Sequence, residues 1–354
     1  MVISKKERNC FFDNLKGLII ILVVMFHLIP TGQNFIFDSL YGFVFTFHMP
    51  FFILISGYFT RNNEKQARKA FSLLLLYYIL SLLFYIFKNQ ELYLSISNIK
   101  NIKLNYEFFI QPFISHYYVS WYLCVIFLYR VFCSSIANIK HFVIVSFIIG
   151  IVGSLLRIDY YMIRRALVLL PFFSIGYYLS KFKLEDIKKY FISKKLAIPF
   201  LILSFFLFII AFYFALKMNK NFSVSCIPFG EKILLDIFSR KRTIILFLIM
   251  SYIFSLGVIY LISTVVTEKK CFFTLPGKNS LCIYFFHAFF TLFIRKHILI
   301  PLLEIGGNDM IFSVLFIAVV MTGLIVLIFS RDIVTKYTIA PLERLSQKIL
   351  IRKD

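Results

Sequence analysis

The sequence is poor in charged residues. They make up 16% of its 354 residues, whereas an ordinary soluble domain contains about 25%. Hydrophobic residues account for 60% of the chain and include 46 Phe and 21 Tyr, and the mean hydropathy is +0.85. Because one water-facing domain cannot bury that much apolar surface, lipid must cover a large part of it. This excludes a soluble globular protein.

Acidic residues are especially scarce. The chain has 17 Asp and Glu against 39 Lys and Arg, for a formal net charge of +22. In a soluble protein this balance would suggest a nucleic-acid partner. In a membrane protein, basic loops face anionic lipid and fix the topology, so we expect the lipid bilayer as the partner and no nucleic acid.

Cysteine patterns and long polar segments are also missing. The six cysteines form no CxxC pair and show no His/Cys spacing typical of zinc, so we expect no metal site. The chain has no visible repeat, low-complexity tract or polar stretch long enough for a soluble domain. We therefore expect residues 1–354 to form a single transmembrane domain, in which any catalysis or transport occurs within the helix bundle.

Long apolar runs fill most of the chain. A helix needs about 20 apolar residues to cross the hydrocarbon core. The runs that meet or approach this length are 15–30, 36–59, 70–87, 117–136, 141–157, 161–180, 196–216, 243–267, 279–295 and 310–330. They predict an all-α, polytopic membrane helix bundle of about ten transmembrane helices. With the N-terminus inside, the inner loops hold more Lys and Arg than the outer ones, so both termini are predicted to be cytoplasmic.

The first apolar run contains two ionisable residues. Lys16 and His27 are separated by ten residues, and at about 100° per residue they share one helix face, roughly 16 Å apart along the axis. Lys16 lies near the inner boundary, within one turn of Asp13. Because an ionisable residue inside the membrane is costly, each is a functional candidate by default.

Two further histidines are expected near the depth of His27. His48 lies about 15 Å along the second predicted span, and His287 about 13 Å along the ninth. Each one alone is equally compatible with a histidine that is hydrogen-bonded across helices. Three histidines at one depth favour a shared site.

A second group of candidates lies near the predicted outer boundary. Trp121, the only tryptophan, and Tyr122 fit either an aromatic belt or a platform on which a sugar ring stacks. Arg164 and Arg165 are either snorkelling anchors or ligands for an acidic or hydroxyl-rich substrate.

Several segments, in this order, resemble one known family. They are FDNLKG at 12–17 followed by His27, FHMPFFILISGY at 47–58, SWYL at 120–123, PFF at 171–173, and GKNSL at 277–281 leading to His287. The chain resembles the membrane-bound acyltransferase-3 family over residues 11 to 295, and within it the fucose 4-O-acetylase and related polysaccharide O-acetyltransferases. Lys16 stands where an arginine is commoner.

The resemblance implies an enzyme that moves an acetyl group from cytoplasmic acetyl-CoA, a co-substrate rather than a bound cofactor, to a sugar hydroxyl of a cell-surface glycan. The Lys, Ile, Asn and Phe content hints at a bacterial plasma membrane and a capsular or envelope glycan. The candidate site residues are His27, Asp13, His48 and His287 for catalysis, Lys16, Arg61 and Arg68 for acetyl-CoA, Trp121, Tyr122, Arg164 and Arg165 for the glycan, and Ser56 and Asn279 within the motifs.

Acetyl transfer requires a base for the sugar hydroxyl and donors for the developing oxyanion. We assign the base to His27, which could alternatively carry the acetyl group covalently. A transporter or flippase for a lipid-linked sugar would also bury polar residues among many spans. It predicts an internal repeat, yet residues 158–354 contain no second copy of the Lys-to-His spacing.

Overall fold

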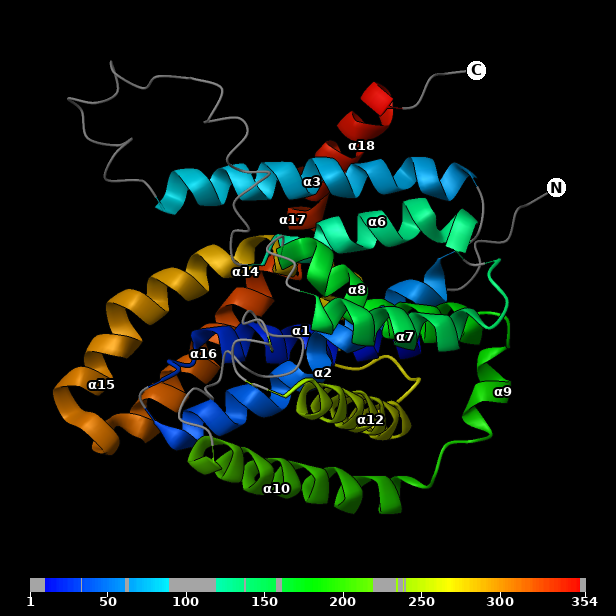
Figure 1. Ribbon diagram of the computed structural model, residues 1–354. Coiled ribbons are helices and arrows are strands. Elements are labelled where there is room, and N and C mark those ends of the chain that lie inside the picture. Colours follow the sequence, from blue (N-terminus) through cyan, green and yellow to red (C-terminus); the bar gives the residue numbers. More distant parts are fainter. Residues whose placement is uncertain are drawn as a thin grey trace. The chain divides into compact units, whose positions relative to one another are not determined.

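The computed structural model describes residues 10–32, 34–60, 64–88, 119–136, 138–156, 161–218, 234, 238 and 240–350. In these ranges every regular element is a helix (Figure 1). Each of the ten apolar runs named above overlaps one of these helices. The predicted all-α fold class is therefore confirmed.

Helix length and composition identify a multi-pass membrane protein. Among the described residues, 7 segments are long and apolar enough to cross a membrane, and one of these, Ser280–Phe329, contains three α-helices joined by short turns. Two further apolar helices are shorter. The cytoplasmic location of both termini stays a prediction.

The chain forms two compact units. The first comprises Met1–Ile55 and Lys181–Tyr337. Its helices are α1 (Cys10–Leu28), most of α2 (Phe35–Phe59), α9 (Leu184–Lys188), α10 (Lys194–Met218), α12 (Lys241–Val265), α13 (Thr274–Lys278), α14 (Ser280–Ile294), α15 (Ile300–Gly306), α16 (Ile311–Phe329) and α17 (Asp332–Tyr337). A π-helical turn, Arg295–Leu299, joins α14 to α15, and a 3-10 turn, Gly307–Met310, joins α15 to α16. The prediction of one domain over the whole chain stays a prediction.

The second unit comprises Ser56–Ser180 and Thr338–Asp354. It holds the end of α2 together with α3 (Glu64–Lys88), α6 (Trp121–Ile136), α7 (Phe142–Leu155), α8 (Tyr161–Leu179) and α18 (Ile339–Leu350). Within it, α3 packs on α6 and on α18, and α8 packs on both α6 and α7. Serine hydroxyls join helices in its interior: Ser81 donates to Ser120 at 2.9 Å, and Ser146 and Ser174 are 2.7 Å apart.

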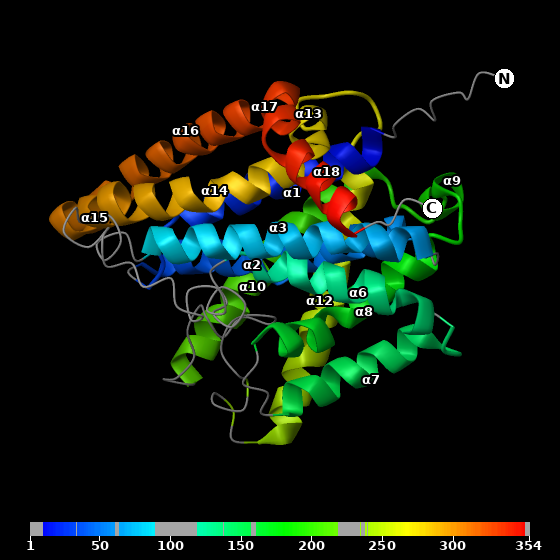
Figure 2. The same cartoon turned by 90° about the horizontal axis from the view of Figure 1, so that it is seen from above.

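Helix α1 lies at the centre of the first unit. It contacts α13, α14 and α16, and Figure 2 shows α14 and α16 running side by side along it. Ile19, Ile20 and Val24 are fully buried in this contact region. By contrast, α10 exposes most of its apolar side chains, and only 11% of its apolar segment is buried. Such a surface is stable against lipid but not against water.

Two glycines let α1 and α13 approach each other at backbone distance. A Cβ atom at Gly17 would overlap the carbonyl oxygen of Phe273, and one at Gly277 would overlap the carbonyl oxygen of Asp13. Small residues at helix contacts allow this close packing in membranes. Gly17 and Gly277 therefore fix the short helix α13 against the first two turns of α1.

We expect Gly277→Ala to destabilise the first unit. The added methyl group meets backbone, which cannot move aside as a side chain does, so overpacking should cost about 1–3 kcal/mol. Thermal unfolding of the purified protein in detergent measures the effect. Gly257→Ala is the matched control, because a Cβ at Gly257 in α12 has open space around it. Equal thermal stability of the two variants would contradict this packing argument.

Pro50 in the middle of α2 explains how α2 is joined to α12. Proline has no N–H, so the carbonyl oxygen of Thr46, four residues earlier, loses its helical hydrogen bond. The hydroxyl of Ser255 donates to this oxygen at 2.6 Å. An unbonded carbonyl inside a membrane is costly, and a neighbouring hydroxyl relieves that cost.

Candidate functional site

Two histidines from distant parts of the sequence meet in the first unit. His27 lies in the last turn of α1, and His287 lies near the middle of α14. Their ring centroids are 5.4 Å apart. His27 is 8% exposed and His287 is completely buried. The pair is thus a candidate site formed where α1 and α14 pack together.

His48 and His27 share the Phe45 ring as a neighbour. The Phe45 ring packs edge-on against His27, with centroids 5.2 Å apart, and the centroids of Phe45 and His48 are 4.3 Å apart. Tyr41 stacks on Phe45 at 3.7 Å. The three histidines predicted from sequence therefore lie close together in the first unit.

Hydrogen bonds define the tautomer of His287. Its Nδ1 lies 2.8 Å from the carbonyl oxygen of Tyr284 and 3.2 Å from that of Ile283. A carbonyl oxygen only accepts, so Nδ1 carries the proton and Nε2 has a lone pair. Within the described part of the chain, Nε2 is buried and has no hydrogen-bond partner. His48 is oriented in a similar way, by a 3.1 Å contact from its Nδ1 to the carbonyl oxygen of Val44.

Asp13 and Lys16 form an ion pair near the beginning of α1. Lys16 Nζ is 2.8 Å from Asp13 Oδ1, and their side chains are 21% and 5% exposed. Both residues and His27 belong to one continuous helix. The rise per residue places Lys16 about 16 Å from His27 along the axis, so the two side chains serve opposite ends of this helix.

Asn14 is a buried polar residue to which the sequence analysis gave no role. Its amide nitrogen donates to the carbonyl oxygens of Thr267 and Lys269 at 2.7 and 2.9 Å, and its amide oxygen accepts from the Thr274 hydroxyl at 2.6 Å. Asn14 thereby ties the connection between α12 and α13 to α1. The signal in the sequence was an uncharged amide beside Asp13 in an otherwise apolar helix.

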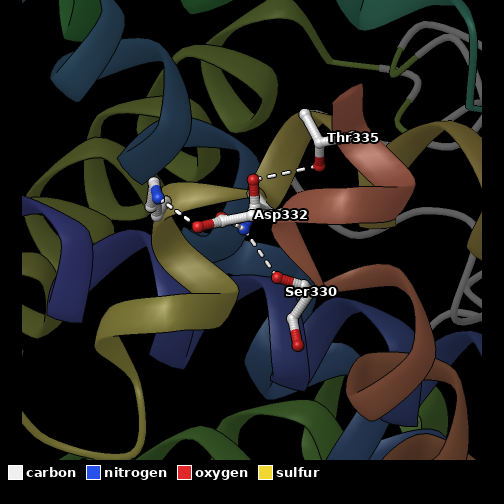
Figure 3. A network of polar contacts seen from close by, with 5 residues as sticks. Ser330, Asp332 and Thr335 are labelled. Atoms are coloured by element: carbon white, nitrogen blue, oxygen red, sulfur yellow. Dashed lines mark hydrogen bonds and ion pairs between the residues drawn. The ribbon is translucent and has the colours of Figure 1, made fainter. Parts of the chain in front are cut away.

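Asn279 has a structural network of its own. Its amide nitrogen donates to the Ser330 carbonyl oxygen at 2.6 Å and to Asp332 Oδ1 at 2.7 Å, and its amide oxygen accepts from the Thr335 hydroxyl at 2.9 Å. Figure 3 shows Ser330, Asp332 and Thr335 close together in this network. Lys278 Nζ pairs with Asp332 Oδ2 at 2.5 Å. These bonds use both amide hydrogens of Asn279 and fix the beginning of α14, so Asn279 positions this helix.

The predicted glycan-binding residues lie in the second unit. The Arg165 guanidinium carbon lies 4.1 Å from the centroid of the Trp121 ring, a cation–π contact. Both residues are buried, as is Arg164. Tyr122 and Ser56 contact each other through their hydroxyl oxygens at 3.1 Å. One face of the Trp121 ring is thus covered by Arg165.

Two candidates for acetyl-CoA contacts fall where the structure gives no side chain. Arg61 lies outside the described residues, and Arg68 belongs to α3 but its side chain is not described. Within the described ranges, no cluster of three or more His, Cys, Asp or Glu side chains is arranged to hold a metal ion.

The chain matches a family model described as an acyltransferase domain, Acyl_transf_3, over residues 9–330. This match includes both histidines of the pair, Asn14, Asn279 and the Trp121–Arg165 contact. Comparison with the curated proteins and with the solved structures gave no match.

Proposed function

The chain belongs to this acyltransferase family, and on that premise we propose that it moves an acetyl group from acetyl-CoA to a sugar hydroxyl of a cell-surface or capsular polysaccharide, or of its lipid-linked precursor. Family membership establishes a membrane enzyme that uses an acyl donor and an acyl acceptor. We propose in addition that the acyl group is acetyl, that the acceptor is a sugar hydroxyl, and that the enzyme lies in a bacterial plasma membrane.

The observation that carries the proposal is the contact between His27 and His287. Their rings are 5.4 Å apart and buried between α1 and α14. A neutral imidazole is a suitable base for a hydroxyl group, because its ordinary pKa is close to the working pH. Two imidazoles at this separation can act on the same acetyl group and the same hydroxyl. The proposal therefore locates acyl transfer at the His27–His287 pair.

Acetyl-CoA is proposed to enter at the end of α1 that carries Lys16. A cation there would attract the phosphates of the donor, and Asp13 holds its ammonium group in place at 2.8 Å. We propose Arg61 and Arg68 as further phosphate ligands. They belong to the first basic segment that follows Lys16 in the sequence. The pantetheine arm would then extend along α1 toward His27.

The acceptor is proposed to bind near Trp121. An indole ring offers an apolar face to a sugar, while Arg165 at 4.1 Å keeps the ring in one orientation. Tyr122, Ser56 and Arg164 would supply hydrogen bonds to hydroxyl or acidic groups. The choice of a polysaccharide rests on the resemblance to polysaccharide O-acetyltransferases.

A comparison of cells with and without the protein tests this function. Proton NMR of the purified surface glycan should lose its O-acetyl signals when the protein is absent. Membranes that contain the protein should transfer label from [14C]acetyl-CoA to glycan in an alkali-labile form. Loss of the surface glycan itself, with the acetyl content of the remainder unchanged, would contradict acyl transfer and support a transporter for a lipid-linked sugar.

We expect Trp121→Ala to weaken use of the glycan acceptor while binding of acetyl-CoA is kept. The change removes the stacking surface in the second unit and leaves the histidine pair intact. Measuring KM for each substrate separates the two effects, and Trp121→Phe, which keeps an aromatic ring, should be close to wild type. An equal rise in KM for both substrates would favour the aromatic-belt interpretation.

A further inference from the structure

The ring of His287 is oriented by backbone on one side and has an unused nitrogen on the other. Nδ1 donates to the carbonyl oxygens of Tyr284 and Ile283. Nε2 is therefore a lone-pair nitrogen, and among the described residues it is buried without a hydrogen-bond partner. A buried polar atom without a partner is unusual in a folded protein and requires an explanation. A reacting group that arrives with the substrate would provide one.

The surroundings of this nitrogen favour proton transfer. His27 on α1 and Tyr284 on α14 are its ring neighbours, with centroids at 5.4 and 5.8 Å. Arg295 lies in the turn that follows α14. Helix α16, which also packs on α14, has no titratable side chain in its sequence. Of the other described elements packed on α14, α13 contains Lys278, and α1 contains Asp13, which is paired with Lys16 at the far end of that helix from His27.

The position of His287 is fixed by rigid structure. Asn279 anchors the beginning of α14 to the end of α16 and to α17 through three hydrogen bonds. His287 comes two turns later on the same helix. Catalytic groups act best when they are carried on rigid elements whose own support is hydrogen-bonded. The Asn279 network thus supplies a physical reason for the fixed direction of the His287 ring.

We propose that Nε2 of His287 is the atom that takes the proton from the acceptor hydroxyl, which rests on the acyl transfer proposed above. The hydroxyl oxygen bonds to the acetyl carbon as its proton moves to Nε2. The carbon–sulfur bond then breaks, and its electron pair stays on the sulfur of CoA. His287 returns the proton to this thiolate, so CoA leaves as the thiol. His27, beside it, donates its ring N–H to the acetyl oxygen as negative charge develops there.

This assignment moves the base from His27, where the sequence analysis put it, to its neighbour. The sequence identified His27 because it shares a helix face with Lys16. It gave no information about which ring nitrogen of either histidine is already used. The bonds from Nδ1 to Tyr284 and Ile283 supply that information for His287.

Two substitutions of His287 separate catalysis from helix support. In His287→Asn the amide nitrogen replaces Nδ1 as a donor to the backbone, and nothing replaces Nε2. In His287→Gln an amide group reaches the place of Nε2 but is not basic. We expect both variants to lose acyl transfer by about 10²–10⁴-fold, the usual range for an acid–base residue.

His297→Asn is the matched control. It is the same substitution in the turn that continues α14, at a histidine that is exposed and packs only its ring on Phe293 at 4.8 Å. The full-length enzyme in native membranes is assayed with [14C]acetyl-CoA and envelope glycan. Size-exclusion chromatography in detergent determines the amount of folded protein for each variant. We expect His297→Asn to be close to wild type.

Activity of His287→Asn close to that of wild type would overturn the proposal, because it would show that only the backbone bonds of His287 matter. The pH profile of activity gives a second readout. It tests the proposal even if one of the variants folds poorly. Wild type should lose activity in acid as Nε2 becomes protonated, and the residual activity of His287→Gln should lack that decline. A decline retained in His287→Gln would overturn the assignment. Inactive His27→Ala together with fully active His287 variants would refute only this inference, whereas full activity of all of them would refute the proposed function.

Discussion

Replacing His27 with alanine is expected to lower acyl transfer by about 10²–10⁴-fold, the range for loss of an acid–base or oxyanion-stabilising group. The change removes one of two imidazoles that lie 5.4 Å apart between α1 and α14. Initial rates of label transfer from [14C]acetyl-CoA measure it. Stability should change little, because His27 lies in the last turn of its helix and is not completely buried.

His48→Ala is the comparison for this prediction. His48 is also an imidazole in the same unit, but the Phe45 ring lies next to both His48 and His27. We therefore expect a milder loss, caused by movement of Phe45 and not by loss of a reacting group. If His27→Ala kept wild-type rates, or if His48→Ala were the more damaging change, the site would not be where we have proposed it.

Inserting one alanine between Val24 and Met25 is expected to reduce activity as strongly as removing His27. The insertion turns the last residues of α1 by about 100° relative to the part that precedes them. His27 then points away from His287, although both residues are still present. The contacts of Asn14 and Gly17 lie before the insertion and stay in register, so the change is confined to the last turn of the helix.

An alanine inserted next to Thr31 provides the control for this insertion. That position follows α1 in the connection to α2, where Gly32 is exposed and a Cβ would meet nothing within 4 Å. This variant has the same added length but keeps His27 in its place, so its rate should stay near that of wild type. A fully active variant with the insertion after Val24, correctly folded, would refute the helical-face argument on which His27 was chosen.

The fold was predictable from composition because lipid imposes a simple requirement. A run of apolar residues long enough to cross a bilayer forms a helix, since no other partner satisfies its backbone there. The start of α1 was less predictable: the first run was expected from residue 15, but the helix begins at Cys10. Asp13 is paired with Lys16 and Asn14 is bonded to three neighbours, so polar residues that suggested a boundary are accommodated inside the helix.

For the candidate site, the sequence could predict which histidines to consider but not how they contact one another. Helical spacing placed three histidines at one depth, but it could not determine that α1 packs on α14 or that Phe45 lies beside both His27 and His48. The role of Asn279 was also hidden. A buried amide can hydrogen-bond to a substrate or to other groups of the protein. The positions of Ser330, Asp332 and Thr335 show that the Asn279 amide bonds to the protein.

The Asn14 network also bears on how the protein is synthesised. Asn14 and Thr274 are 260 residues apart along the chain. At about 5–20 residues per second, the ribosome needs roughly 13–50 s to reach the partner of Asn14 after making it. During that time the Asn14 amide, near the inner boundary of the first helix, is without the Thr274 hydroxyl that it bonds in the folded protein. His287 follows later still, so a chain that ends before Thr274 lacks both this hydroxyl and the second imidazole.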